Sequence, residues 1–181
     1  MENSLKNIIR KYQNSFKNKV YVDENNDVDL LMNVFGVTPD LKRENRQYWG
    51  RELGMCWQLL VIELFKNTRD DFDACIKIGK DEPCDLTAGT YAIDTKYRIG
   101  SGDSGTLKKF KSYGPKLKEM GYSPLFLIVR EDNLSAAITA CGVGGWTVLT
   151  GKDTYKFIRE FTKFDLEQFL LDNRENFNIE R

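Results

Sequence analysis

The sequence predicts an α/β fold in which a mixed central sheet is flanked by helices. Three stretches lead to this prediction. Residues 42–66 carry the longest helical pattern, residues 85–98 alternate in polarity around a glycine turn, and residues 124–130 form a continuous apolar run. Such a run is typical of a strand buried in the middle of a sheet. Because helical and strand patterns alternate along the chain, a sheet covered by helices follows.

Residues 1–44 predict a helical extension before this core. Residues 4–19 show helical spacing, residues 28–36 predict a short helix that Gly36 ends, and Pro39 suits the start of another. The segment has no catalytic signature, so we expect it to pack on the core or to contribute to dimerisation. The apolar stripe of the first helix contains Leu5, Ile8, Ile9, Tyr12 and Phe16.

Residues 45–150 hold the strand patterns. The pair Gly114-Pro115 interrupts one helical pattern and is expected to weaken or break that helix. A glycine-rich loop is expected at residues 141–145. In chain order we expect a strand at 73–79, the hairpin at 85–98, a helix at 106–120, a strand at 124–130, a short helix at 133–140 and a strand at 146–150.

Residues 151–181 predict two closing helices, at 153–161 and 165–173, with Asp153 and Asp165 as N-caps. With 181 residues, the chain is expected to form one domain with its own core.

The composition excludes several kinds of chemistry. The chain has no histidine, which rules out hydrolases and nucleases that use a histidine base or nucleophile. Its formal net charge is zero, which argues against a strongly non-specific DNA binder. The four cysteines show no zinc spacing, so we expect reduced thiols in a cytoplasmic protein. No apolar run is long enough to span a membrane, and we expect no membrane association.

The hairpin pattern brings two acids and a lysine together. If Ala88-Gly89 is a two-residue turn, Asp85 pairs with Ala92 and lies diagonal to Asp94. Two carboxylates then converge beside Lys96, on the face turned away from the core, whereas a turn of odd length would move Asp85 to the other face. On the second arm, Ala92, Asp94, Lys96 and Arg98 share this face, and Tyr91, Ile93, Thr95 and Tyr97 share the core face.

These residues resemble the PD-(D/E)XK signature of nucleases, which occurs in type II restriction endonucleases and several repair nucleases. The resemblance rests on Pro83-Cys84-Asp85 followed by Asp94-Thr95-Lys96, and it departs from the pattern by one inserted residue, Cys84. It covers roughly residues 45–150. It implies that this segment is a catalytic core with the restriction-endonuclease-like order α-β-β-β-α-β.

The resemblance also implies a Mg²⁺ site. Asp85 and Asp94 would hold the ion together with the backbone carbonyl of Thr95, and Lys96 would position the attacking water. Family members often carry a further acid on the helix before the hairpin, for which Glu52 is the first choice and Glu63 the alternative. The products would carry 5′-phosphates.

Contacts with double-stranded DNA are expected along the chain that follows Lys96. Between Lys96 and Lys118 there are seven lysine or arginine residues against the single Asp103. A local basic patch on a neutral protein fits binding in a shaped site. The expected contact residues are Arg98, Ser101, Ser104, Thr106, Lys108, Lys109 and Lys111.

The favoured function is a type II restriction endonuclease that acts as a homodimer on a short palindrome. One alternative is a repair or junction-resolving nuclease of the same fold. Another is a catalytically inactive DNA-binding domain, against which the intact set of Asp85, Asp94 and Lys96 counts.

Overall fold

The computed structural model has a five-stranded mixed sheet at its centre. It describes residues 2–17, 19–102, 104–174 and 176–179. The strands lie in the order β2-β3-β4-β6-β7, with antiparallel pairing from β2 to β4 and parallel pairing from β4 to β7. They are β2 (Phe72–Ala74), β3 (Leu86–Ala88), β4 (Tyr91–Lys96), β6 (Ser123–Ile128) and β7 (Thr147–Thr150).

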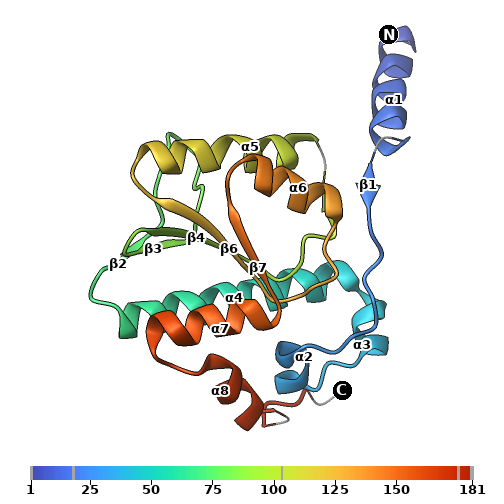
Figure 1. Ribbon diagram of the computed structural model, residues 1–181. Helices are drawn as coiled ribbons and strands as arrows, with labels where there is room; N and C mark the ends of the chain where they lie inside the picture. Colours follow the sequence, from blue (N-terminus) through green and yellow to red (C-terminus); the bar gives the residue numbers. More distant parts are fainter. Residues whose placement is uncertain (1, 18, 103, 175, 180–181) are drawn as a thin grey trace.

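Helices cover both faces of this sheet (Figure 1), so the predicted α/β class with a helix-flanked mixed sheet is confirmed. The helices α4 (Arg46–Thr68) and α7 (Lys152–Thr162) lie on one face, and α5 (Ser104–Glu119) and α6 (Ser135–Val143) lie on the other. Outside the first pair, α2 (Leu30–Phe35) packs against α8 (Leu166–Asp172), and α3 (Pro39–Glu44) precedes α4.

The long helix α4 forms because its apolar side chains recur every four residues on one face. Its fully or almost fully buried residues are Trp49, Leu53, Trp57, Val61 and Phe65. The helix begins later than the predicted residue 42, because Asn45 caps it by accepting a hydrogen bond from the backbone N–H of Tyr48. The indole Nε1 of Trp57 donates to the carbonyl of Leu127 at 3.1 Å, which ties α4 to the C-terminal end of β6.

A second apolar layer lies under α5 and α6. The rings of Phe126 and Trp146 lie 4.3 Å apart between centroids, and the indole Nε1 of Trp146 donates to the carbonyl of Phe110 at 2.8 Å. Ala92 is fully buried in this layer. The face of β4 that carries Ala92 and Asp94 is therefore packed, which corrects the expectation that it is turned away from any core.

Residues 23–45 pack on the body through buried charges. The ammonium of Lys42, only 4% exposed, donates to Glu24 and to the hydroxyl of Tyr97. Arg130, also 4% exposed, forms ion pairs with Asp29 and with Asp132 at 3.3 Å and 2.8 Å. The predicted packing of the extension on the core therefore holds for this part of it.

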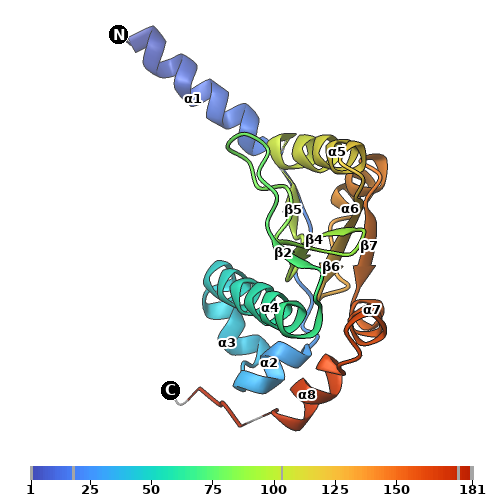
Figure 2. The same cartoon turned by 90° about the vertical axis from the view of Figure 1, so that its left-hand side faces the viewer.

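The helix α1 (Glu2–Lys17) behaves differently. It projects away from the body in both views (Figures 1 and 2), and its apolar stripe is exposed. The chain that follows it is attached by a two-stranded pairing of β1 (Val20–Tyr21) with β5 (Ser101–Gly102).

The predicted strand at 73–79 is shorter than expected. β2 ends at Ala74, and Ile78 and Asp81 close a tight turn through reciprocal backbone hydrogen bonds of 2.9 Å and 3.1 Å. Gly79 permits this turn because its φ is +65°. The alternation of Ala74, Ile76 and Ile78 was therefore a misleading signal for a longer strand.

Three helix boundaries also differ from the predictions. α5 continues through Pro115, because Leu117 in the next turn is fully buried and its packing offsets the lost backbone hydrogen bond. α6 extends to Val143 and takes up most of the predicted glycine-rich loop. Asp165 caps α8 as predicted, whereas α7 begins after Gly151 and Asp153 lies inside its first turn.

The close approach of α5 to the end of α6 yields a prediction. A Cβ at Gly114 would overlap the carbonyl oxygen of Gly144, so Gly114→Ala should lower the free energy of unfolding by about 1–3 kcal/mol. Gly142→Ala is the matched control, since Gly142 lies in α6 with open space at its Cβ position. This control should be neutral or stabilise by about 0.5–1 kcal/mol. Urea unfolding checks both values, and equal stability of the two variants would contradict the packing described.

Candidate active site

The register of the β3–β4 hairpin differs from the prediction by two residues. Ala88 pairs with Tyr91 and Leu86 with Ile93, so the turn is Gly89-Thr90 instead of Ala88-Gly89. Gly89 has a φ of +55°, and a glycine at the first position is what a type II′ turn requires. The turn still has two residues. Asp85 lies at the level of Asp94 and not of Ala92, but its carboxylate bonds to the side chain of Thr95 and to Gln58 of α4. It therefore points to the α4 side of β4, opposite to Asp94, which corrects the prediction that the two acids share a face.

Asp85 is held in place by hydrogen bonds from two elements. One carboxylate oxygen accepts from both the backbone N–H and the hydroxyl of Thr95, each at 2.7 Å. The other oxygen accepts from Nε2 of Gln58, on α4, at 2.7 Å. The backbone N–H of Asp85 donates to the carbonyl of Ile93 at 2.8 Å, which fixes the residue where β3 begins.

Asp94 and Lys96 form an ion pair on the α5 side of β4. The side chain of Asp94 is 14% exposed and that of Lys96 is 36% exposed. The ammonium of Lys96 also donates to the carbonyl of Thr95 at 3.1 Å. The structure thus brings together Asp94 and Lys96, two of the residues that the resemblance implied, and leaves Asp85 close enough for its charge to act on both.

Burial sets the protonation of this pair. It raises the pKa of Asp94 to about 6 against the opposing effect of the Lys96 ammonium, and the negative charge of Asp85 adds to the increase. For Lys96, burial would lower the pKa, but the carboxylates of Asp94 and Asp85 outweigh it and raise the pKa. Lys96 is therefore a firmly protonated donor at neutral pH.

A pocket of about 290 Å³ opens over Asp94 and Lys96. Thr106, Lys109 and Tyr113 line it from one face of α5, with spacings of three and four residues along the helix. The opposite wall is the turn at residues 80–82, and Asp81 reaches the ammonium of Lys109 at 3.6 Å. Two of the predicted DNA contacts, Thr106 and Lys109, thus share a pocket with the acid and the lysine.

The structure does not bring either proposed fourth acid to this pair. Glu52 forms an exposed ion pair with Arg51 at 2.9 Å, and Glu63 accepts from Nδ2 of Asn67 at 2.8 Å. Among the described residues, no three acidic or cysteine side chains are grouped closely enough to hold a metal ion. On α4, Gln58 contacts Asp85 instead.

Sequence reasoning missed Gln58, although a signal was present. It is a polar residue inside the otherwise apolar run of residues 57–62, next to the fully buried Trp57. A polar side chain at such a position needs an internal partner. That partner is the carboxylate of Asp85.

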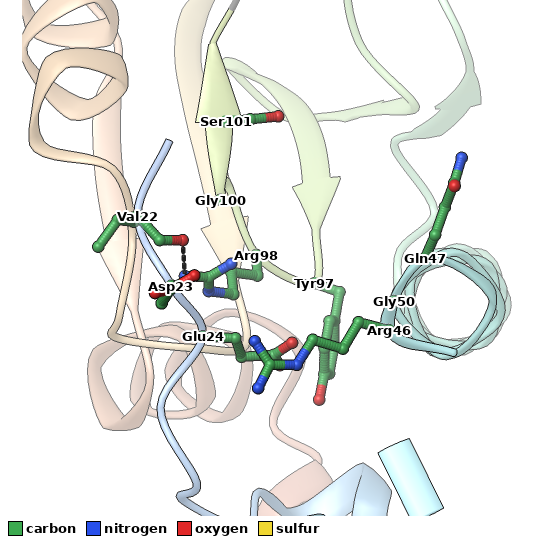
Figure 3. Close-up of a pocket in the computed structure, with 10 residues that line it drawn as sticks. All are labelled: Val22, Asp23, Glu24, Arg46, Gln47, Gly50, Tyr97, Arg98, Gly100 and Ser101. Atoms are coloured by element: carbon green, nitrogen blue, oxygen red, sulfur yellow. Dashed lines mark hydrogen bonds between the residues drawn. The ribbon is translucent and has the colours of Figure 1, made fainter. Parts of the chain in front are cut away.

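Arg98 and Ser101 lie at a different pocket, of about 460 Å³, between the N-terminal segment and the start of α4 (Figure 3). Arg98 donates to the carbonyl of Val22 at 2.9 Å and forms an ion pair with Asp132 at 3.0 Å. Its side chain is 11% exposed, so it holds the N-terminal segment to the body. Arg46 reaches the same pocket from α4.

The other predicted DNA contacts are spread along α5. Lys108 and Lys111 are exposed and do not line the pocket over Asp94. Ser104 begins α5, but its side chain lies outside the described side chains.

Comparison of the chain with protein-family models, with curated proteins and with solved structures found no match. The class of the protein is therefore inferred from its own residues. Among the residues that the structure describes, no helix combines the length and apolarity needed to cross a bilayer.

The raised pKa of Asp94 predicts a pH dependence of stability. Between pH 3.8 and about 6 the folded chain binds the Asp94 proton more tightly than the unfolded chain does. Its unfolding free energy therefore falls as the pH rises through this window. Asp94→Asn lacks this titration, so its stability relative to the parent should increase between pH 4 and 7, by on the order of 2 kcal/mol.

Urea unfolding in EDTA measures this difference. Asp165→Asn is the control, because the backbone N–H of Gln168 lowers the pKa of Asp165. That residue contributes stability above its unfolded pKa, so its removal should change the pH dependence in the opposite sense. A constant difference between Asp94→Asn and the parent would refute the assigned burial of this carboxylate.

Proposed function

We propose that the protein is a Mg²⁺-dependent endonuclease of the PD-(D/E)XK type, and specifically a type II restriction endonuclease that cleaves double-stranded DNA as a homodimer. The observation that carries the proposal is the ion pair of Asp94 with Lys96 at the floor of a pocket, with the charge of Asp85 acting on both residues from the segment just before β3. The mixed sheet flanked by helices, with α4 before the hairpin and α5 after it, also supports the proposal.

The donor set suits Mg²⁺. The ion is commonly bound through one or two carboxylates, keeps several waters and takes further oxygens from a phosphate. Asp85 and Asp94 offer two carboxylates. Burial, to which the charge of Asp85 adds, raises the pKa of Asp94 to about 6, so a bound cation would be favoured beside it. The carbonyl of Thr95 would be a third oxygen. When bound, the ion would polarise the scissile phosphate and acidify a water.

The residues of the chain have separable roles in this proposal. Gln58 and Thr95 orient the carboxylate of Asp85 through their hydrogen bonds. Lys96, protonated and partly exposed, offsets phosphate charge and orients the attacking water as a donor. Lys109 lies where it can contact a neighbouring phosphate if Asp81 releases it. We place Gln58, not Glu52, as the α4 residue of the site.

Cleavage of unmethylated phage DNA in Mg²⁺ tests the proposed function. The parent protein should give discrete fragments with 5′-phosphates, and EDTA should abolish the reaction. Asp85→Asn, Asp94→Asn and Lys96→Met should each lower the rate by about 10²–10³-fold or more, with circular dichroism and DNA binding retained. Cleavage restricted to branched junctions would favour the repair or junction-resolving alternative. Cleavage rates close to that of the parent in the folded Asp94→Asn and Lys96→Met variants would refute the nuclease proposal.

A second comparison separates Gln58 from the acids on α4. Gln58→Ala should lower the cleavage rate by about tenfold or more. The carboxylate of Asp85 accepts three hydrogen bonds, and this substitution removes one of them. Glu52→Ala and Glu63→Ala should stay close to the parent in a single-turnover assay with saturating protein. A large loss in Glu52→Ala with Gln58→Ala unaffected would reverse this assignment.

A further inference from the structure

The helix α1 carries an apolar stripe that its own chain leaves uncovered. Its five large apolar residues are between 52% and 72% exposed, and Figures 1 and 2 show the helix projecting away from the body. Contiguous apolar surface of this kind on a soluble chain usually marks an interaction site. The stripe contains Leu5, Ile8, Ile9, Tyr12 and Phe16.

A second uncovered row runs along the outer face of α4. Tyr48, Met55 and Leu59 are 42%, 50% and 58% exposed. Their spacings of seven and four residues put them on one face of the helix, opposite the buried face that begins with Trp49. This row has the same helical periodicity as the stripe on α1, so the two can pack as a pair of helices.

The charges beside the two rows favour pairing of α1 with α4 over pairing of α1 with another α1. α1 carries the cations Lys6, Arg10, Lys11 and Lys17 against the single acid Glu2. Two α1 helices packed on each other would therefore bring like charges together. The row on α4 is accompanied on the same side of the helix by two acids, Glu52 and Glu63, and by two cations, Arg51 and Lys66. This balanced side repels α1 less than a second α1 would. The present partner of Glu52 is the exposed Arg51, and exchanging such a surface ion pair costs little.

The chain cannot easily place its own α1 on its own α4. The pairing of β1 with β5 fixes the chain shortly after α1 ends, and both views separate α1 from α4. The row on α4 is thus left for another molecule that carries the same stripe.

We propose that α1 of one chain docks on the outer face of α4 of a second copy, and that the contact is reciprocal about a two-fold axis. One helix pair alone buries little area, but a two-fold dimer contains the contact twice. The proposal locates the dimer contact that the proposed function calls for, yet it concerns assembly alone and its test does not measure cleavage.

Sedimentation equilibrium of the full chain tests the proposal. The parent should be a dimer. An α1 variant, Ile9→Glu with Phe16→Glu, and an α4 variant, Met55→Glu with Leu59→Glu, should each weaken dimerisation by about 10- to 100-fold. All four residues are exposed, so both variants should keep the parental circular dichroism. Asn7→Glu is the control, because Asn7 lies on the side of α1 opposite the stripe.

Mixing the two variants distinguishes docking on α4 from pairing between α1 helices. In the reciprocal dimer, a mixed pair retains one intact contact, from the α1 of the α4 variant to the α4 of the α1 variant. The mixture should therefore form more dimer than either variant alone. A monomeric parent, or an α4 variant that dimerises as tightly as the parent, would overturn the proposal. Either result would leave the cleavage assay to decide the proposed function separately.

Discussion

The burial of β4 on both faces is the constraint on which the rest of the structure depends. As the central strand of the sheet, it packs against α4 on one side and α5 on the other, so its polar side chains must find partners inside the protein. Thr95 finds Asp85, and Asp94 finds Lys96. Beyond the strand, Tyr97 donates to Asp29 and accepts from Lys42, which secures the N-terminal segment. The candidate site and the buried charges around Tyr97 both result from this need of buried polar groups for internal partners.

The same constraint makes the candidate site costly to the fold. A carboxylate with a pKa of about 6 is mostly ionised at neutral pH, in surroundings that disfavour its charge. A sequence selected for stability alone would place an apolar residue there. The placement of Asp94 and Lys96 at a pocket, within range of the charge of Asp85, is what the proposed catalytic role would require. Gln58 and Thr95 support this reading, because they hold Asp85 where its charge acts on Asp94.

The sequence predicted the two faces of β4 because they depend only on the alternation of side chains along a strand. It misplaced the side chain of Asp85, which lies just before β3 and bonds to Thr95 and Gln58. The register was wrong because a glycine with positive φ can occupy either turn position, and only the three-dimensional pairing decides between them. Gln58 was missed because its partner, Asp85, lies 27 residues away in the chain. Arg98 was assigned to DNA for the same reason, since Asp132 lies 34 residues further on. The periodicity of the sequence predicts helices and strands. Which polar side chains remain available to bind a ligand depends on contacts between segments that are distant in the sequence.

The charges that fasten the N-terminal segment have a consequence for biosynthesis. Arg130 donates to Asn25 and to the carbonyl of Asp27 across separations of 105 and 103 residues. While a ribosome is still making the chain, Asn25, Asp27 and Asp29 emerge long before their cationic partner exists. These residues therefore remain hydrated until β6 and the following Arg130 have been synthesised. Closing this long loop is an entropically costly step. Residues 25–29 are therefore fixed only after a partner that is synthesised about a hundred residues later.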